Sequence, residues 1–327
     1  MKETVSVILP VRNEEKYIAR CLDSIVDQDY SKGDLEVLVV DGMSDDGTRA
    51  IIERYVMSHS FIRILDNPRR ITPCALNIGI RMARGNIIIR MDGHATYDAE
   101  YVKNCMETLD KTEANNVGGP LRHVGEGFIG HAIALAEVCR FGTGGAKFRT
   151  TKNEQYVDTV FLGAWYKKTF EKYGYFNEKL VRNQDIEHNS RIRKKGGRIY
   201  LTPQIKSFYY CRLSLKDLWV QNFRTGFWNI KTIKIVPGSL SLRHFVPLVF
   251  VMGLLTSWVI PNLWLAIMIS YLSCNFFFSL KIAAANGFKY FFIMPVVFLT
   301  LHLSYGLGLL AGIIEFLTFG LRRREQC

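Results

Sequence analysis

Acidic side chains follow two of the apolar runs in this 327-residue chain, at the point where each run ends. Asp41 comes directly after Leu35–Val40, and Asp92 follows Asn86–Met91, with His94 two residues further on. Carboxylate oxygens and imidazole nitrogens bind divalent cations; magnesium prefers oxygen ligands, whereas manganese also accepts imidazole. If both runs are parallel strands of one sheet, these groups meet at one edge and form a polar site.

The turn that Asp41 opens is crowded with further acidic residues, in the order Asp-Gly-Met-Ser-Asp-Asp-Gly. A purely structural role is open for part of it, because Ser44 or Asp45 can cap the helix that follows. Capping accounts for one or two of these side chains and leaves Asp41 for another task.

A second acidic pair, Asp185 and Glu187, lies in a segment rich in arginine. One explanation is electrostatic, because Arg182, Arg191 and Arg193 are close enough along a charged helix to form salt bridges with it. The other is a functional role for one of the two carboxylates. Spacing alone leaves both explanations open.

Short β-branched runs alternate with amphipathic stretches in the first part of the chain. We predict strands at Val5–Leu9, Leu35–Val40, Ile62–Leu65 and Asn86–Met91, and helices at Glu14–Val26, Thr48–Met57 and Cys74–Met82. Strands separated by helices in this way form a parallel sheet with helices on its faces, an α/β architecture. Pro10 can end the first strand, because proline donates no ladder hydrogen bond, and Glu14 then joins the acidic edge.

The later part of the chain differs in composition and in its predicted elements. Glycine-rich loops occupy Gly118–Pro120 and Gly142–Gly145, and Phe170–Lys195 is predicted to be largely helical. Leu213–Ile235 is a basic, aromatic and amphipathic segment. From His244 to Leu280 the chain contains no Asp, Glu, Lys or Arg, so the composition alone marks a domain boundary before this segment.

The apolar segment indicates a membrane anchor. Phe245–Leu280 is longer than the roughly 20 residues of one span, and a Pro-Asn pair near its middle predicts two short or tilted helices. Tyr290–Ile314 supplies another, so we predict three spans. Three spans would place Arg322–Arg324 opposite the N-terminal domain, against the positive-inside rule. Either one segment is interfacial, or Tyr290–Leu321 folds back as a hairpin around Gly306–Gly308.

The net charge of +12 is compatible with nucleic acid, anionic lipid or phosphorylated substrates. No nucleic-acid-binding module is recognisable, and basic residues beside a membrane segment mark the cytoplasmic face. The seven cysteines show no paired spacing, which is typical of thiols in a reducing compartment. The chain starts with a strand and no signal peptide. We therefore expect a multi-pass protein of the inner or plasma membrane with a cytoplasmic N-terminal domain.

Taken together, these segments resemble the family 2 glycosyltransferases, inverting enzymes with a GT-A nucleotide-sugar-binding fold. The opening pattern, the V-V-D-G-x-S-x-D-G-T block at Asp41 and the Asp92 motif recur at fitting intervals over roughly residues 4–235. The resemblance implies that Asp41 lies near a uracil base and that Arg70 lies near the base or a phosphate, although Arg69 competes for that role. The nucleotide-sugar site that it implies comprises Pro10, Val11, Glu14, Asp41, Arg70, Asp92 and Gly93.

The resemblance also implies a metal site and a catalytic base. The family carries D-x-D where this chain has Asp92-Gly93-His94, so Asp92 and His94 would hold Mn²⁺ or Mg²⁺ against the diphosphate, with manganese favoured; alternatively His94 only donates a hydrogen bond. An Asp near Asp185 is the family's general base. Gln184 stands where the family often has Glu, and Glu187 competes with Asp185 for the role.

Gln221 and Arg224 match the Q-x-x-R part of the family's Q-x-x-R-W motif, but Thr225 stands in place of the tryptophan. The resemblance implies a contact with the diphosphate or the acceptor, and the planar guanidinium of arginine suits a diphosphate. A basic helix that faces lipid headgroups explains the same residues.

The resemblance, which extends to succinoglycan-type exopolysaccharide glucosyltransferases, implies transfer of a hexose from a nucleotide sugar, UDP-hexose in the first place, to a hydroxyl of a polyprenyl-diphosphate-linked saccharide. A polyprenyl-phosphate sugar synthase and a non-catalytic nucleotide-sugar-binding membrane subunit remain alternatives. A Rossmann dehydrogenase would need G-x-G-x-x-G after its first strand, where this chain has Pro10-Val-Arg-Asn. The expected domains are catalytic (1–212), amphipathic (213–243), transmembrane (244–321) and a basic tail (322–327).

Overall fold

The computed structural model describes residues 4–145, 151 and 153–324. It divides the chain into two units, Met1–Arg122 with Lys147–Tyr209, and His123–Ala146 with Tyr210–Cys327. The segment 123–146 therefore groups with the C-terminal unit, whereas the sequence reading assigned everything up to residue 212 to the catalytic domain.

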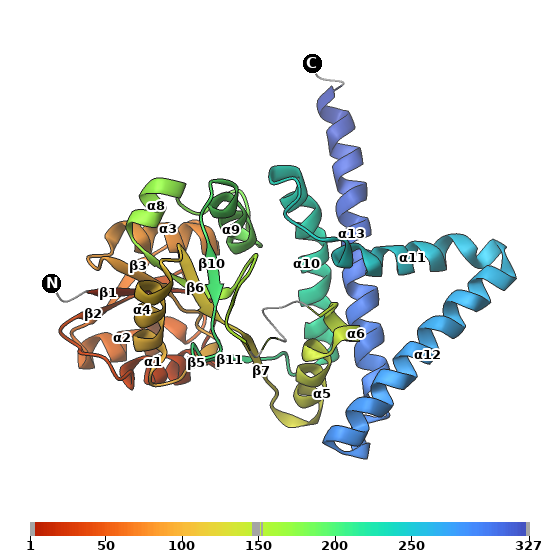
Figure 1. The fold of residues 1–327 in the computed structure, drawn as a ribbon, viewed down its shortest axis with the longest axis horizontal. Helices are drawn as coiled ribbons and strands as arrows, with labels where there is room; N and C mark the ends of the chain where they lie inside the picture. The colour runs from red at the N-terminus through yellow and green to blue at the C-terminus, as the bar shows by residue number, and fades with distance from the viewer. Residues whose placement is uncertain (1–3, 146–150, 152, 325–327) are drawn as a thin grey trace. The chain divides into compact units, whose positions relative to one another are not determined.

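The first unit is an α/β fold, as the sequence predicts (Figure 1). Its strands are β1 (Val5–Val11), β2 (Leu35–Asp41), β3 (Ile62–Asp66), β4 (Ile87–Arg90), β5 (Ala95–Tyr97), β6 (Asn116–Gly119), β8 (Gln155–Tyr156), β9 (Phe161–Tyr166) and β10 (Ile199–Leu201). Its helices are α1 (Ile18–Val26), α2 (Thr48–Ser58), α3 (Thr72–Met82), α4 (Tyr101–Thr112), α8 (Lys168–Tyr173) and α9 (Gln184–Lys194).

The main sheet has the strand order β3-β2-β1-β4-β9-β6-β10-β8. The four strands predicted from the sequence are all parallel, with β1 between β2 and β4. β9 pairs antiparallel with both β4 and β6. A second sheet, in the order β5-β11-β7, includes β7 (Leu121–Val124) and β11 (Ser207–Tyr210).

Alternation along β1 explains why the sheet is covered on both faces. Val7 and Leu9 belong to one core with α1, α2 and α4, whereas Ile8 belongs to the opposite core with α3, α8 and α9. Gly79 lets α3 approach closely, because a Cβ there would lie 2.5 Å from Ile8 Cγ2. This packing fixes the ends of the central strands, from which the polar loops emerge.

The segment Phe170–Lys195, predicted to be largely helical, is helical only at its two ends. The structure has two helices, α8 and α9, with a non-helical segment from Gly174 to Asn183 between them. Gly174 and Asn183 both have positive φ, at 84° and 61°, which ends α8 and begins α9 abruptly.

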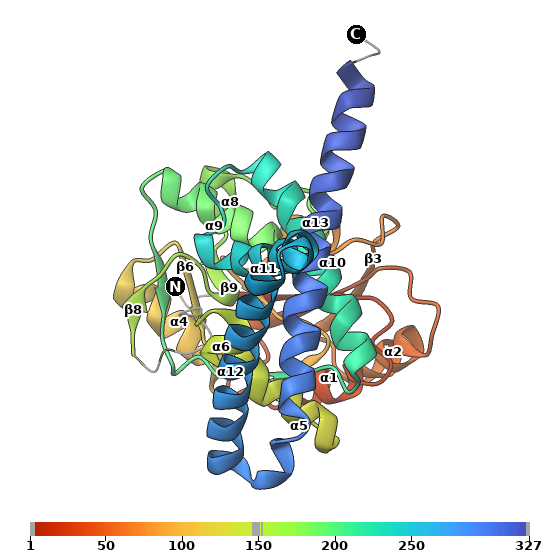
Figure 2. The same cartoon turned by 90° about the vertical axis from the view of Figure 1, so that its right-hand side faces the viewer.

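The second unit contains α5 (Gly127–Val138), α6 (Arg140–Thr143), α10 (Leu215–Ile235), α11 (Val246–Thr256), α12 (Pro261–Asn286) and α13 (Met294–Arg324). The amphipathic segment predicted over Leu213–Ile235 is α10. Within the described residues, two helices are long and apolar enough to cross a membrane, Asn262–Asn286 and Met294–Thr318. They meet at the turn Phe288–Tyr290 (Figure 2).

The structure corrects two expectations for this region. α11 has only 11 residues, too few for a span, so two helices among the described residues are long and apolar enough to cross a membrane, where three spans are predicted. The hairpin around Gly306–Gly308, one of the two alternatives for the topology, is absent from the described chain, because α13 runs unbroken through these residues. Its glycines serve packing: a Cβ on Gly308 would overlap the carbonyl oxygen of Phe223 on α10.

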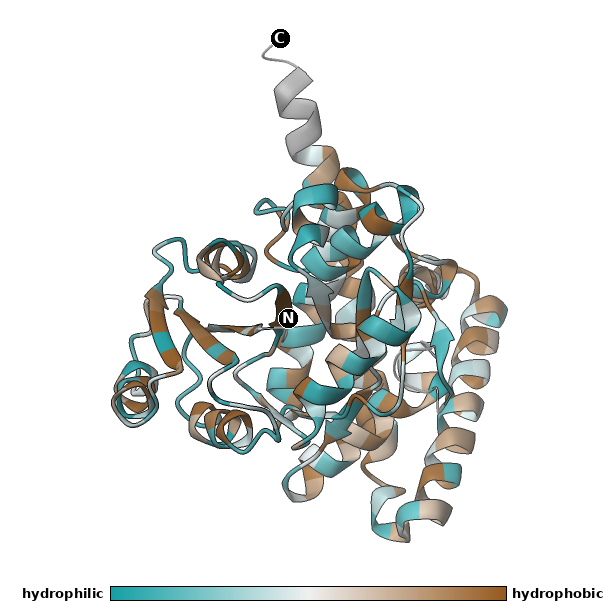
Figure 3. Ribbon diagram, turned by 60° about the vertical axis from the view of Figure 1, so that its left-hand side comes forward, coloured by the Kyte–Doolittle hydropathy of each residue, from teal (hydrophilic) through white to brown (hydrophobic). Residues whose placement is uncertain are grey.

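Apolar side chains recur along the C-terminal helices (Figure 3). On α12 many of the large ones are exposed, among them Leu265, Ile269, Leu272 and Phe276. A water-facing helix would bury such a surface or replace it with polar residues. Length, composition and exposure together indicate membrane association for this unit.

Candidate functional site

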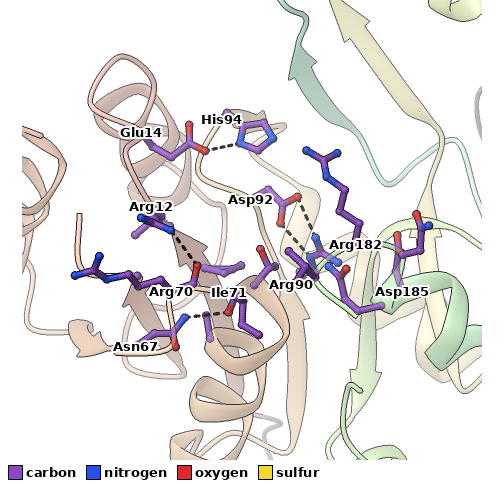
Figure 4. Close-up of a pocket in the computed structure, with 18 residues that line it drawn as sticks. Arg12, Glu14, Asn67, Arg70, Ile71, Arg90, Asp92, His94, Arg182 and Asp185 are labelled. Atoms are coloured by element: carbon purple, nitrogen blue, oxygen red, sulfur yellow. Dashed lines mark hydrogen bonds and ion pairs between the residues drawn. The ribbon is translucent and has the colours of Figure 1, made fainter. Parts of the chain in front are cut away.

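A cleft of about 400 Å³ lies in the first unit (Figure 4). It is bounded by the ends of β1 and β4, the turn before α3 and the first residues of α9. Seven residues predicted for the site line this cleft, namely Pro10, Val11, Glu14, Arg70, Asp92, His94 and Asp185. Side chains separated by up to 175 positions are thus brought to one place.

Asp92 is fixed by an arginine that the sequence analysis missed. Arg90 Nε lies 3.0 Å from Asp92 Oδ1, and its Nη2 lies 3.2 Å from Oδ2, in a two-bond ion pair at the end of β4. Burial disfavours the charge on Arg90, but Asp92 and Asp185 outweigh it, so the pKa of Arg90 is raised. The sequence did contain a signal for this pair. Arg90 ends a run of three isoleucines, which indicates a buried position, and a buried cation needs an anionic partner.

His94 is oriented by Glu14. The imidazole Nδ1 lies 2.9 Å from Glu14 Oε1, and its ring packs edge-on against Tyr209. A carboxylate behind an imidazole is the usual support of a metal-binding histidine, since it fixes the ring orientation and tautomer. Gly93 allows the close approach of the two loops, because a Cβ there would lie 2.9 Å from Val11 Cγ1.

The structure separates the two candidate bases on α9. Glu187 is buried and forms a two-bond ion pair with Arg191, at 3.0 and 2.7 Å, and it does not line the cleft. Asp185 lines the cleft at the first turn of α9, where its Oδ1 accepts a hydrogen bond from the backbone of Ile186. The salt-bridge explanation therefore fits Glu187, and the geometry favours Asp185 as the functional carboxylate.

The competition between Arg69 and Arg70 is decided in the same way. Arg69 Nη1 lies 2.5 Å from Glu178 Oε2, whereas Arg70 lines the cleft. Arg12 donates from Nη1 to the carbonyl oxygen of Arg70 at 3.5 Å, which ties the loop after β1 to the turn before α3.

Asn67 is a further cleft residue to which the sequence analysis gave no role. Its Nδ2 donates to the carbonyl oxygen of Ile71 at 3.0 Å. Its buried Oδ1 has no hydrogen-bond partner among the described residues. A buried acceptor without a partner is costly in an empty protein, and an N–H of a bound ligand would satisfy it.

Asp41 lies at the end of β2 with its side chain fully buried. It accepts a 2.6 Å hydrogen bond from Ser44 Oγ, and Arg49 Nη1 lies 3.4 Å from its Oδ2. Its neighbour Gly42 lines the cleft. Neither Ser44 nor Asp45 caps α2; Asp46 instead accepts the N–H of Thr48 at 3.0 Å, which accounts for the lowered pKa of Asp46 despite some burial.

Gln221 and Arg224 belong to α10 in the second unit. Gln221 Oε1 accepts a 2.7 Å hydrogen bond from Arg212 Nε. Their predicted contact with a diphosphate or an acceptor stays a prediction.

Strained backbone concentrates in the loops around the cleft. Six non-glycine residues in the described chain have positive φ, and four of them are Asn13, Met43, Arg70 and Asn183. Each lines the cleft or is next in sequence to a residue that does. Such conformations cost on the order of 1–3 kcal/mol each and persist where the surrounding structure holds a functional arrangement.

The charge of the cleft suits a diphosphate with a divalent ion. Guanidinium groups outnumber carboxylates among its lining residues, which include Arg12, Arg70, Arg90 and Arg182 against Glu14, Asp92 and Asp185. Magnesium and manganese sites in phosphate-transfer enzymes combine one or two protein ligands with phosphate oxygens and water. Asp92 and the supported imidazole of His94 fit that arrangement.

Comparison with known proteins matches residues 6–168 to the family model described as glycosyl transferase family 2. A relative from Methanococcus voltae is 29% identical over 319 residues, 95% of this chain and 97% of its own. It is named dolichyl N-acetyl-alpha-D-glucosaminyl phosphate 3-beta-D-2,3-diacetamido-2,3-dideoxy-beta-D-glucuronosyltransferase. The succinoglycan biosynthesis protein ExoA of Rhizobium meliloti is 29% identical over 247 residues, 74% of each chain.

Two solved structures share the fold. The mannosyltransferase PcManGT from Pyrobaculum calidifontis, in complex with GDP-Man and Mn²⁺, aligns over 93% of this chain and 87% of its own, with a TM-score of 0.58 and 19% identity. S. aureus TarS 1-349 in complex with UDP-GlcNAc aligns over 97% and 92%, with a TM-score of 0.54 and 16% identity. The predicted GT-A fold is thereby confirmed.

Proposed function

Since the chain is a family 2 glycosyltransferase of GT-A fold, we propose that it transfers a sugar from a nucleoside diphosphate, UDP-hexose in the first place, to a hydroxyl group of a lipid-linked saccharide. The observation that carries the proposal is the convergence of Asp92, His94 and Asp185 on one arginine-rich cleft at the strand ends.

The donor binds across the loops after β1, β2 and β3. The loops at Gly42 and at Asn67–Arg70 receive the nucleoside, and the Oδ1 of Asn67 accepts an N–H of the base, such as N3–H of uracil. Arg70 and Arg12 lie where they can neutralise the diphosphate. A charge-assisted hydrogen bond from a guanidinium to a phosphate oxygen is among the stronger contacts available in a protein.

Asp92 and His94 are the residues that would hold a divalent ion, Mn²⁺ or Mg²⁺. When bound, the ion supplies charge neutralisation on the leaving diphosphate, which is worth several kcal/mol. Arg90 holds the Asp92 carboxylate in place through its two-bond ion pair, and Glu14 keeps the imidazole of His94 in place.

Asp185 accepts the proton of the acceptor hydroxyl. The hydroxyl oxygen forms a bond to the anomeric carbon as the bond from that carbon to the diphosphate oxygen breaks, so the configuration inverts and the nucleoside diphosphate leaves. A base placed for this transfer contributes about 10²–10⁴-fold to the rate. The position of Asp185 in the first turn of α9, where it lines the cleft, supports the role.

A lipid-linked acceptor follows from the second unit and from the relatives. The Methanococcus voltae relative is named for transfer to a dolichyl-phosphate-linked N-acetylglucosamine, and ExoA is named for succinoglycan biosynthesis. Two helices long and apolar enough to cross a membrane would hold the enzyme at the bilayer that contains such lipids.

Two spans would also remove the topology conflict. With an even number of crossings, Arg322–Arg324 return to the side of the N-terminal domain, as the positive-inside rule requires. We place the first unit and the basic tail on the cytoplasmic side of the cell membrane, with the short α11 lying at the interface.

The proposal is tested by offering the full-length enzyme in membranes two acceptors and a panel of radiolabelled UDP-, GDP- and dTDP-sugars, including uronic acid sugars. We expect label from a UDP-sugar on a polyprenyl-diphosphate-linked saccharide. Label on bare polyprenyl phosphate instead would favour the sugar-phosphate synthase. Donor binding with no transfer to any acceptor would favour the non-catalytic subunit.

A further inference from the structure

A second group of metal-ligand side chains lies in the second unit, where no part of the proposed reaction uses it. His123 of β7, Glu137 of α5 and Cys211, which follows β11, offer three ligand atoms within 4.8 Å of one another. His123 Nδ1 lies 2.8 Å from Glu137 Oε2, and Cys211 Sγ lies 3.3 Å from that oxygen and 3.4 Å from the nitrogen. The three atoms form a small triangle.

All three groups are withdrawn from water. The side chains of His123 and Glu137 are 2% and 9% exposed, and Cys211 as a residue is 1% exposed. A buried carboxylate is expensive unless its charge is compensated. Glu137 lies on the apolar helix α5 and is the one acidic residue between Gly127 and Val138. Its carboxylate therefore stands out in a helix whose other residues are mostly apolar.

Hydrogen bonding alone places two donors on one acceptor. The imidazole N–H and the thiol S–H would both donate to Glu137 Oε2, which a carboxylate oxygen can accept, and the 3.4 Å between Sγ and Nδ1 would then hold no hydrogen bond. A metal ion gives one cause for all three separations, because each atom then directs a lone pair to a common centre.

We propose that His123, Glu137 and Cys211 bind a zinc ion. Zinc accepts thiolate, imidazole and carboxylate together, and soft thiolate ligands select it over magnesium or manganese. Tetrahedral zinc with ordinary bond lengths holds such ligand atoms roughly 3.4–3.6 Å apart, so the two sulfur separations fit and the nitrogen–oxygen separation needs only a small opening. A water molecule completes the four ligands.

The proposed sugar transfer does not use this ion, and its effect on the fold is to connect three segments of the second unit. It joins the end of strand β7, the last turn of α5 and the chain leaving β11, where the backbone N–H of Cys211 already donates to Val124 O at 2.9 Å. Because binding requires the folded arrangement, its free energy adds to stability. It is distinct from the ion at Asp92 and His94 in ligand set and in selectivity.

The test measures metal in the full-length protein, purified in detergent from zinc-supplemented cells. Wild type should carry zinc in stoichiometric amount by mass spectrometry of the metal, and Cys211→Ser should lose most of it. Cys139→Ser, at a cysteine two residues after Glu137, and Asp92→Asn, in the cleft, should both retain it. Removal of zinc by a chelator should lower the melting temperature of wild type and leave that of Cys211→Ser unchanged.

If the Cys211→Ser variant does not fold, a measurement on the wild-type protein still tests the proposal. Cobalt exchanged into the site should show the intense near-ultraviolet band of a cobalt–thiolate bond, unchanged in Cys139→Ser. Wild type that holds no more zinc than Cys211→Ser, or cobalt-loaded wild type without the thiolate band, would overturn the proposal and leave a buried ion pair with a thiol.

Discussion

His188 gives the first unit a calculable sensitivity to acid. It lies on α9, three residues after Asp185, and is fully buried among the rings of Phe170, Phe176 and Trp165, with centroid distances of 5.2, 4.8 and 6.2 Å. Burial, together with the nearby charge of Arg191, lowers the pKa of His188 to about 3. The ring is therefore neutral in the native protein at any pH where the enzyme works.

The sign of the effect follows from proton binding. The unfolded chain takes up a proton on this histidine below about pH 6.5, and the native state does not, so stability is full above pH 6.5 and falls as the pH drops toward 3. Each pH unit in that window costs about 1.4 kcal/mol, and the loss between roughly pH 7.5 and pH 5 amounts to about 2 kcal/mol. His188 lies on the helix that carries Asp185, so that helix should lose stability over the same range.

Urea unfolding followed by circular dichroism at a series of pH values measures this loss. His188→Phe keeps an aromatic ring in the cage and cannot titrate, so the difference in slope between it and wild type isolates the histidine. His59→Gln, at a half-exposed histidine after α2, should keep the wild-type slope. Equal slopes for wild type and His188→Phe would refute the reasoning.

Three further substitutions test the contacts that hold the site and the helices. Arg90→Met leaves Asp92 without its two-bond partner and should lower the free energy of unfolding by about 3 kcal/mol, measured by chemical denaturation; no loss would mean that the pair is not formed. Asn67→Ala removes the proposed acceptor for the base and should raise the donor KM about tenfold with little change in kcat, as steady-state kinetics would reveal. Gly308→Val forces α13 away from the carbonyl of Phe223 and should cost on the order of 2 kcal/mol, seen as a lower melting temperature in detergent.

The strands and the acidic edge could be predicted because their signals are local. Apolar runs such as Leu35–Val40 end where polar residues begin, and the observed β2 extends only one residue further, to Asp41. A parallel sheet then brings the strand ends together whatever the loops contain. This is why Glu14 and Asp92 reach one cleft as expected.

Charge pairing could be predicted only in part, because it depends on which side chains meet in the fold: the sequence offers Arg191 as a partner for Asp185 or Glu187 but does not say which of the two it pairs with. Arg69 finds Glu178 and Glu187 finds Arg191, and these pairs leave Arg70 and Asp185 to the cleft. Composition shows only that arginines and acids are near one another in sequence.

The helix count failed for a related reason. Absence of charge over Phe245–Leu280 predicts burial in lipid but not the length of each helix, and the chain places only 11 residues in α11. Gly306 and Gly308 suggested a turn, yet in α13 they allow close backbone packing against α11 and α10.

The most direct test of the account is radiolabelled sugar transfer to a lipid-linked saccharide by wild type, Asp185→Asn and Glu187→Gln. Asp185→Asn should bind the nucleotide sugar normally and lose about 10²–10⁴-fold in kcat, because only the proton acceptor is removed. Glu187→Gln should lose stability through its broken pair with Arg191 and keep the greater part of its kcat while folded. Full transfer by Asp185→Asn would contradict the central claim that this carboxylate activates the acceptor hydroxyl.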